Sequence, residues 1–505
     1  MKTTLLSALI SLVPALTPAP AAAENIRLTV VHVNDVHGWA MSQPDRKETE
    51  RQVGGAGALA NFVASSRKAG PVLLLDGGDW FQGTPEGTIP RGKMMAEVFN
   101  VLRVDASVVG NHEYDIGEDG VKELVAQMNF PVLGSNVYAK GMDRVADYLK
   151  PYVVKEIAGV KVGIFGLLTT KMPALSFAEN IAGLEFRDEI ETAQAMVAEL
   201  KRQGADIIVL LSHVGYEGSD RHETTLGDQT IAKRVPGIDL IVGSHTHSPI
   251  FKPERVNGAL IVQAWGYLTH VGEVTLDIDP ATKKVVASEG RIVKLWVDQW
   301  GEAPEMTAIV RRYQDEIGRR LSEVIGTAED TLSRNYQKED PVGRWMTDCM
   351  RKWTKTDIAI QNGGGVRGNI QAGPVLLRDM FEIMPFDNRL VTLNMTGAAV
   401  LDILDHGVSG NIGWIEVSGV RALYDPAAAK GRRIKQAWVG ERKLEPKAVY
   451  SVSAPDFAVQ GGSGYDFSTG RDKANTSTLI RDVLIWCTRN YSPIRMPADE
   501  RTVRD

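Results

Sequence analysis

Short apolar runs alternate with stretches of helical spacing from Ile26 to Val293. The runs are rich in Val, Ile and Leu, and most end at Gly, Asn, Asp or Ser, as buried strands do. The predicted strands are Ile26–Val33, Val72–Leu75, Ala106–Val109, Val132–Leu133, Val162–Leu168, Ile207–Leu211 and Leu240–Val242. The predicted helices between them include Gly57–Lys68, Ile190–Gln203 and Thr230–Arg234. This alternation of strands and helices predicts a layered α/β domain.

A charged, amphipathic segment from Met306 to Val324 separates this region from the rest of the chain. Its apolar residues recur at helical spacing, and Gly326 follows its end. We interpret it as a helix that connects two domains, although a surface helix of the first domain would show the same spacing. We therefore predict a targeting segment over residues 1–23, a first domain over 24–300, a connecting helix over 301–326 and a second domain over 327–505.

Polar residues of the kinds that bind metals follow the carboxyl ends of the predicted strands. Open α/β sheets bind their ligands at this edge. One His or Asp in such a place would more simply be a loop residue with a local hydrogen bond, but here the placement recurs at strand after strand. The recurring residues are Asp35, His37, Asp79, Asn111, His112, His213, His245 and His247.

Without His112, the set combines imidazole nitrogens with carboxylate and amide oxygens, and it contains no thiolate. Such ligands suit divalent ions from Zn and Fe to harder ions such as Mn, and the set is larger than one tetrahedral ion needs. Two ions that share one carboxylate would use all of it. Paired ions clamp the oxygens of a phosphoester and lower the pKa of bound water to about 7. The pattern therefore predicts a phosphoester-hydrolysing site with two divalent ions, which could be Zn, Mn, Fe, Co or Mg.

Composition and charge narrow the classes of partner. The chain has 505 residues, of which 43% are hydrophobic and 24% charged, so it has room for two domains. Its net charge of −6 argues against binding to a nucleic acid polymer, which usually needs a basic surface. A small anionic substrate stays compatible with this charge if metal ions concentrate positive charge at the site.

The N-terminus has the order of a signal peptide. Lys2 precedes a short apolar run from Leu5 to Leu16, and Ala21–Ala23 provide small residues for cleavage before Glu24. The run is too short to span a bilayer, and a buried first helix is the alternative interpretation. No Cys follows the run to carry a lipid, and no other stretch is long and apolar enough to span a membrane. We therefore expect an exported protein, periplasmic or extracellular, without a membrane anchor.

The chain has two cysteines, Cys349 and Cys487, in segments of helical character. Neither has a neighbouring cysteine at metal-ligand spacing. An oxidising compartment would permit a disulfide between them. Two separate buried thiols fit the sequence equally well, because the sequence does not show whether the two residues meet.

Five sequence blocks resemble the motifs of calcineurin-like metallophosphoesterases, in the order of that family: His32–Gly38, Gly77–Asp79, Gly110–Asp115, Ser212–Gly215 and Gly243–His247. Three later segments resemble the C-terminal domain of secreted 5′-nucleotidases: Asn362–Arg367, Met384–Asn388, and Phe457 with Gly461–Tyr465. The resemblance covers nearly the whole chain after residue 23. It implies a four-layer sandwich of β-sheets flanked by helices, joined by a linker helix to a smaller α+β substrate-binding domain. The active site would lie between the two domains.

The resemblance also implies roles for the matched residues. The ligands would divide between two ions that Asp79 bridges: Asp35, His37 and His247 for the first, and Asn111, His213 and His245 for the second. His112 would stabilise charge in the transition state, and Asp115 would orient it. Glu113 matches no ligand position, so we expect it to support the site locally.

On the substrate side, the resemblance places Arg367 at the phosphate, Asn388 near the nucleoside, and Trp414 and Phe457 on the two faces of the base. The planar fork of Arg367 matches phosphate oxygens, and base stacking tolerates different bases. Without the resemblance, Arg367 would be a surface residue on a Gly-rich turn and each aromatic a core residue. Ser463 stands where the family usually has an Asp that accepts hydrogen bonds from ribose hydroxyls. Ser accepts hydrogen bonds with less reach and without charge.

We therefore predict an exported phosphohydrolase that releases phosphate from nucleoside 5′-monophosphates or related nucleotides, by in-line attack of metal-bound hydroxide. Because of Ser463, the same site could instead serve a 2′,3′-cyclic nucleotide phosphodiesterase, a nucleotide-sugar or polyphosphate hydrolase, or a thiosulfohydrolase-like relative. A non-catalytic nucleotide- or metal-binding protein is expected to have lost a ligand or His112, and this chain has lost neither. The sequence does not specify the native metals, the preferred base or the oligomeric state.

Overall fold

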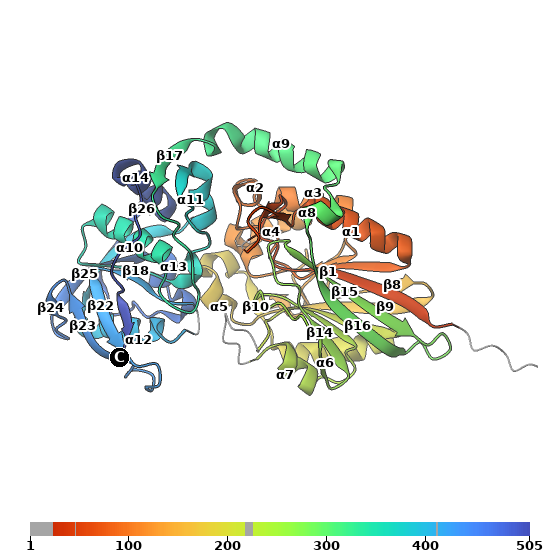
Figure 1. Ribbon diagram of the computed structural model, residues 1–505. Coiled ribbons are helices and arrows are strands. Elements are labelled where there is room, and N and C mark those ends of the chain that lie inside the picture. Colours follow the sequence, from red (N-terminus) through yellow and green to blue (C-terminus); the bar gives the residue numbers. More distant parts are fainter. Residues whose placement is uncertain (1–23, 46, 218–225, 411–412) are drawn as a thin grey trace, which may run out of the picture.

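The chain forms two lobes that one long helix connects (Figure 1). The computed structural model describes residues 24–45, 47–217, 226–410 and 413–505. The predicted signal peptide, residues 1–23, lies outside the described residues. Within the described part of the chain, no helix has the length and apolar character needed to cross a membrane.

The first lobe contains two six-stranded sheets. In order across the first sheet lie β16 (Val285–Lys294), β15 (His270–Ile278), β1 (Ile26–Val33), β4 (Val72–Asp76), β5 (Ala106–Val108) and β6 (Val132–Leu133). In order across the second lie β13 (Glu254–Val256), β14 (Ala259–Val262), β12 (Leu240–Gly243), β11 (Ile207–His213), β9 (Val160–Leu168) and β8 (Tyr152–Ile157). Each predicted strand is present, with its ends shifted by two residues at most. Strands β1, β4, β5 and β6 run parallel, as do β9, β11, β12 and β14.

The two sheets pack face to face, and helices cover their outer faces. Along β1, Val30 packs between the sheets and Val31 packs under the helices, as alternation along a strand requires. On the outside of the first sheet lie α1 (Ala56–Ala69), α3 (Lys93–Leu102) and α4 (Gly117–Val125). On the outside of the second lie α6 (Glu189–Arg202) and α7 (Asp228–Arg234). The predicted four-layer sandwich is confirmed.

The second lobe is smaller and mixes helices with two larger sheets and one two-stranded sheet. Its larger sheet has the order β21 (Glu416–Ser418), β18 (Ile358–Gln361), β25 (Val449–Pro455), β20 (Arg389–Thr396) and β26 (Arg471–Leu479). Its smaller sheet has the order β24 (Arg442–Lys443), β23 (Ile434–Val439), β22 (Val420–Tyr424) and β27 (Thr502–Arg504). One hydrophobic cluster of the lobe includes α10 (Pro341–Thr354), α11 (Leu377–Ile383) and α14 (Ile480–Tyr491), and another includes α12 (Gly397–Gly407).

Short elements complete both lobes. The short strands are β2 (Gln43–Pro44) paired with β3 (Gln52–Val53), and β7 (Val137–Ala139) paired with β10 (Leu184–Phe186). The one-turn helices are α2 (Pro85–Thr88), α5 (Met172–Leu175), α8 (Val297–Trp300), α13 (Asp456–Val459), η1 (His112–Ile116), η2 (Ala178–Ile181), η3 (Gly363–Gly365) and η4 (Gly462–Gly464).

Helix α9 (Pro304–Leu321) belongs to the cores of both lobes. Met306 and Val310 pack into the first lobe, and Leu321 packs into the second. The helix ends before Val324, where the prediction placed its end, because Val324 begins β17 (Val324–Ala328), which pairs with β19 (Gly373–Leu376). Helical spacing in the sequence continues to Val324, but pairing with a distant strand ends the helix before that residue.

Cys349 and Cys487 form a disulfide between α10 and α14, with their Cα atoms 5.7 Å apart. Of the two alternatives that the sequence allowed, the structure has the bridge. Both residues are buried in the core of the second lobe.

Candidate active site

The predicted metal ligands meet at one edge of the first lobe, where the strands of both sheets end. Asp79 follows β4, His213 ends β11, and the remaining ligands follow β1, β5 and β12. Five of the seven have a left-handed backbone with φ between 48° and 69°: Asp35, His37, Asp79, His245 and His247. This conformation is uncommon for residues other than glycine, costs about 1–3 kcal/mol each, and clusters at functional sites. The fold therefore maintains strained turns that direct these side chains towards one point.

Four of these side chains form a compact, buried group. Asp35, His37, Asp79 and His247 each offer one ligand atom, and these atoms all lie within 4.8 Å of one another. The Nε2 atoms of His37 and His247 are 3.1 Å apart. Asp35 Oδ1 lies 3.5 Å from His247 Nε2, and Asp79 Oδ2 lies 3.8 Å from His37 Nε2.

A second group adjoins the first through Asp79. His213 Nε2 lies 3.3 Å from Asp79 Oδ2 and 3.2 Å from Asn111 Oδ1. The same Asn111 oxygen lies 2.9 Å from His245 Nδ1. Asp79 Oδ2 thus faces imidazoles of both groups. The donor sets, each with imidazole nitrogens and a share in one carboxylate, fit two divalent ions side by side.

Backbone carbonyls orient the imidazoles. His213 Nδ1 lies 2.7 Å from the Gly77 carbonyl, and His37 Nδ1 lies 3.2 Å from the Phe81 carbonyl. A ring that donates from Nδ1 to a carbonyl keeps the lone pair of Nε2 free for a metal ion.

Glu113 supports the loops that carry the ligands. Its fully buried carboxylate accepts hydrogen bonds from the backbone nitrogens of Asp79 at 3.0 Å, Trp80 at 2.7 Å and Gly110 at 2.7 Å. This one side chain therefore joins the turn after β4 to the turn after β5. Asn34 supports Asp35 in a similar way, because its amide donates to Asp35 Oδ2 at 2.6 Å and to the Trp265 carbonyl at 2.7 Å.

The buried carboxylates of Asp35 and Asp79 have pKa values shifted in opposite directions. Burial raises the pKa of Asp35 to about 7, and the neighbouring negative charge of Asp79 adds to this effect. Burial also acts on Asp79, but His213, His112 and His37 keep the pKa of its carboxyl well below the usual range. Two buried carboxylates at such close range need positive charge between them, which divalent ions would provide.

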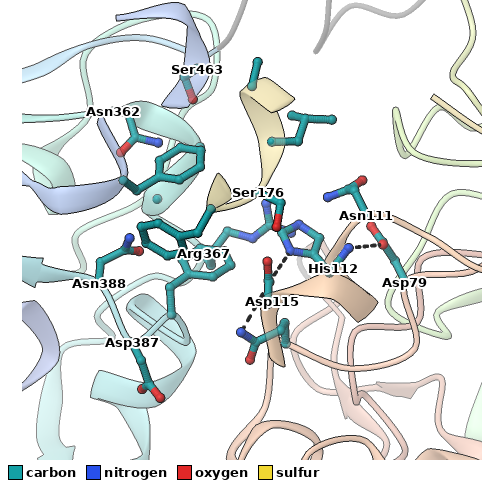
Figure 2. Close-up of a pocket in the computed structure, with 18 of the residues that line it drawn as sticks. Asp79, Asn111, His112, Asp115, Ser176, Asn362, Arg367, Asp387, Asn388 and Ser463 are labelled. Carbon is teal, nitrogen blue, oxygen red and sulfur yellow. Dashed lines mark hydrogen bonds and ion pairs between the residues drawn. The ribbon is translucent and has the colours of Figure 1, made fainter. Parts of the chain in front are cut away.

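His112 lies at the open side of the ligand groups. Its Nδ1 atom is 2.7 Å from Asp115 Oδ2, and its backbone nitrogen donates to Asp79 Oδ1 at 3.0 Å (Figure 2). Burial opposes protonation, but the carboxylates of Asp115 and Asp79 raise the pKa of the His112 imidazole. This environment favours an imidazolium that can face an anion.

A cavity of about 960 Å³ lies between the lobes and joins these residues to the second lobe. Arg367 enters it from the second lobe, and its Nη2 atom lies 3.4 Å from His37 Nε2. Asn388, Phe457 and Ser463 also line the cavity. Figure 2 shows Arg367, Asn388 and Ser463 on the side of the second lobe, and Asp79, Asn111 and His112 on the other.

Trp414, which the resemblance places on one face of the base, does not line this cavity in the structure. Its side chain lies in the core of the second lobe with 6% of its surface exposed. The indole nitrogen donates to Thr502 Oγ1 at 2.9 Å, and the ring packs edge-to-face against Tyr424. A buried indole whose N–H donor is satisfied has no reason to turn out towards the cavity. Phe177 of the first lobe contacts Phe457 instead, with ring centroids 5.9 Å apart.

Several residues in or beside the cavity escaped the sequence analysis. Phe177 carries no motif, and only the fold brings it to Phe457. Tyr267 packs near the rings of His37 and His247, and Arg334 donates to the Gly363 carbonyl at 3.2 Å. Other cavity residues outside the matched sequence blocks include Phe381, His406 and Arg481.

Comparison with known proteins accounts for both lobes. Residues 28–249 match the calcineurin-like phosphoesterase family, and residues 324–469 match the 5′-nucleotidase C-terminal domain. The chain belongs to the 5′-nucleotidase family. It is a metal-dependent phosphoesterase of that family, and its buried Asp and His residues form the metal-binding cluster.

This 5′-nucleotidase-family hydrolase resembles its relatives along nearly its whole length. It is 28% identical to a 5′-nucleotidase from Vibrio cholerae over 99% of this chain and 97% of that protein. It is 29% identical to a snake venom 5′-nucleotidase from Crotalus adamanteus over 92% of this chain and 86% of that protein. A solved structure of a 5′-nucleotidase precursor from Thermus thermophilus superposes with a TM-score of 0.87 at 28% identity, covering 95% of this chain and 99% of that one.

The fold alone does not specify the substrate. A sulfate thiohydrolase from Thermus thermophilus shares it, with a TM-score of 0.80 at 18% identity over 94% of this chain and 96% of that chain. The substrate must therefore be inferred from the residues that line the cavity.

Proposed function

We propose that the protein hydrolyses nucleoside 5′-monophosphates with two divalent ions and releases inorganic phosphate. One observation carries this proposal: the two ligand groups that share Asp79 face Arg367 across a cavity between the lobes, with His112 beside them. With both ions bound, positive groups would lie on both sides of the space that a phosphate would occupy.

The seven predicted ligands would hold the ions. Asp35, His37 and His247 would bind one ion, Asn111, His213 and His245 the other, and Asp79 both. When bound, such a pair supplies hydroxide at neutral pH and offsets the charge of the phosphate oxygens. The ligands combine nitrogen and oxygen donors, which is compatible with Zn, Mn, Fe, Co or Mg, so we propose no single native metal.

The protein's own contribution is positioning and charge stabilisation. Arg367 would hold two phosphate oxygens in its planar guanidinium fork. His112, held by Asp115, would donate a hydrogen bond to an oxygen that gains charge in the transition state. Asn388, Phe457 and Ser463 would contact the nucleoside, with Phe457 stacked against the base.

The same proposal extends to domain limits and location. We propose a catalytic domain over residues 24–300, a linker helix over 301–326 and a substrate-binding domain over 327–505, after a signal peptide over 1–23. Export to a periplasmic or extracellular space agrees with the disulfide between Cys349 and Cys487, since disulfides persist in oxidising compartments.

The direct experiment is phosphate release from AMP and from other nucleotides by the metal-loaded protein. We expect release by the wild type and its loss in Asp79→Asn. If no nucleotide yields phosphate and Asp79→Asn behaves like the wild type, the proposal fails.

A second candidate substrate class is a related ester without a recognised ribose. The observation that favours it is Ser463, whose short side chain replaces the family's usual Asp and whose carbonyl accepts from His406 Nε2 at 2.8 Å. A panel with AMP, a 2′,3′-cyclic nucleotide, a nucleotide sugar, polyphosphate and a thiosulfonate (R–S–SO₃⁻) separates the classes. A clear preference for AMP over every ribose-free substrate would rule out the second class.

A further inference from the structure

Gln263 lies beside the segment of residues 244–248, which carries two of the predicted metal ligands, His245 and His247. The segment follows β12, and Gln263 follows β14, which pairs in parallel with β12. The Gln263 carbonyl accepts a hydrogen bond from the Ile250 backbone nitrogen at 3.1 Å, just beyond the segment. The side chain of Gln263 is fully buried. Strand pairing therefore brings this side chain against the ligand segment.

The amide of Gln263 binds the backbone at both ends of the segment. Its Nε2 atom donates to the Ser244 carbonyl at 3.0 Å, and its Oε1 atom accepts from the Ser248 backbone nitrogen. Ser244 directly precedes His245, and Ser248 directly follows His247. A primary amide carries a donor and an acceptor on one rigid group. One side chain therefore fixes the distance between the two ends of the segment.

The segment needs such a restraint because its backbone is strained. His245 and His247 have left-handed φ angles of 69° and 49°. Residues other than glycine keep this conformation only where the surrounding structure over-determines it. Gly243, at the end of β12, leaves the necessary room, since a Cβ atom there would lie 2.2 Å from Asp228 Oδ2 and 3.2 Å from Gln263 Nε2.

The two histidines of the segment belong to different ligand groups. His247 Nε2 lies 3.5 Å from Asp35 Oδ1, in the first group. His245 Nδ1 lies 2.9 Å from Asn111 Oδ1, in the second. A change in the span of the segment would therefore move one ligand of each group.

We infer that Gln263 is a positioning residue that sets the separation of His245 and His247 and so adjusts both metal sites together. The inference rests on the two-ion part of the proposed function. Gln263 acts through the backbone of the segment, because both polar atoms of its amide are engaged there. It complements Glu113, which joins the turns after β4 and β5.

The test removes the amide and keeps the length of the side chain. Gln263→Met is expected to weaken the binding of both ions about tenfold or more, as is typical when an outer partner of the ligands is lost. Titration of the chelator-treated protein with Mn²⁺, followed by the EPR signal of free Mn²⁺, measures both affinities without a substrate. Asn100→Leu is the matched control, since the Asn100 amide donates to the Gln127 carbonyl at 2.7 Å and accepts from the Asn129 nitrogen at 2.7 Å, outside the cavity.

The pattern of loss separates positioning from a merely structural role. Weaker binding of only one ion would overturn the inference. So would a lower melting temperature in Gln263→Met with the Mn²⁺ affinities of Asn100→Leu. Excess Mn²⁺ should restore most of the kcat of Gln263→Met, because all its ligands remain. A kcat that stays low with both ions bound would contradict a role through the metal sites.

The metal-loaded wild type provides a test that needs no variant. In a crystal structure with Mn²⁺, two bound ions and both amide bonds of Gln263, to Ser244 and to Ser248, would support the inference. Loss of either bond would overturn it, even if Gln263→Met fails to fold. Two bound ions in a protein that hydrolyses no nucleotide would sink the proposed function and leave the role of Gln263 standing.

Discussion

The two sides of the cavity are built differently. On the first lobe, the ligands follow sheet strands, are mostly buried, and are held by backbone hydrogen bonds and by the Glu113 carboxylate. On the second lobe, Phe457 and Ser463 belong to one-turn helices and are only partly buried. The first side retains every expected ligand. The second has Ser463 in place of an acid and Trp414 withdrawn into the core.

The difference follows from the interactions that each side must make. Metal coordination needs donor atoms of the right kind at nearly fixed distances, so few substitutions are compatible with it. Base stacking needs only a flat apolar ring nearby, and many arrangements supply one. The metal ligands of the first lobe therefore constrain the type of reaction strongly. The cavity residues of the second lobe constrain the choice of substrate only weakly.

The largest effect should come from the shared ligand. Asp79→Asn removes the charge that both ligand groups share, and we expect kcat to fall about a thousandfold or more. A chelator should inactivate the wild type to a similar extent. Added Mn²⁺ or Zn²⁺ should restore the activity of the chelator-treated wild type but should not restore the activity of Asp79→Asn. Activity assays before and after metal addition measure this, with circular dichroism to verify folding. If excess metal restored the activity of Asp79→Asn, Asp79 would not be a ligand that both ions share.

Arg367 provides the next test, on the opposite side of the cavity. Arg367→Ala should lower kcat/KM about a hundredfold, because the phosphate loses a charge-assisted, two-pronged partner. Arg367→Lys should recover part of this, since Lys keeps the charge without the planar fork. Arg421→Ala, at an exposed Arg of β22, is the matched control. Equal activity of Arg367→Ala and the control would remove Arg367 from the site.

The two aromatics predicted for the base should behave differently. Phe457→Ala should raise KM for AMP roughly tenfold or more, since base stacking is worth about 1–3 kcal/mol. Trp414→Phe should leave KM unchanged and lower the melting temperature, because Thr502 loses its indole partner in the core. Michaelis constants and thermal unfolding of both variants measure the contrast. A rise in KM for Trp414→Phe at unchanged stability would return Trp414 to the base site.

The smallest effect concerns Ser463. Ser463→Asp restores the acid usual in the family, and the left-handed backbone at this position, with φ of 54°, is one that Asp tolerates. We expect KM for AMP to fall several-fold, as is typical of one added charge-assisted hydrogen bond, and KM for the 2′,3′-dideoxy analogue to change little. Equal effects on both substrates would mean that the residue at 463 does not contact the ribose.

The sequence was informative wherever function depends on local chemistry. The strand ends could be predicted because runs such as Ile207–Leu211 are apolar, β-branched and short. The ligands could be predicted because residues of metal-binding types follow these runs. Glu113 was expected to be a support rather than a ligand, and its three backbone acceptor contacts agree with that interpretation.

Other features depend on contacts between distant segments, which spacing does not encode. Periodicity placed the end of α9 at Val324, whereas pairing with β19 makes Val324 a strand residue. The approach of Cys349 to Cys487 required the packing of α10 on α14, across a separation of 138 residues. Phe177 carries no motif and meets Phe457 only because the lobes adjoin.

The sequence by itself thus determined the layered α/β class, the metal-ligand set and the family resemblance, because strand ends and ligand types are local properties. The tertiary structure alone decided that Asp79 faces both ligand groups, that Trp414 belongs to the core, and that Gln263 binds both ends of the segment 244–248. These are outcomes of packing, in which each side chain takes the position that best satisfies its volume and its polar atoms at once.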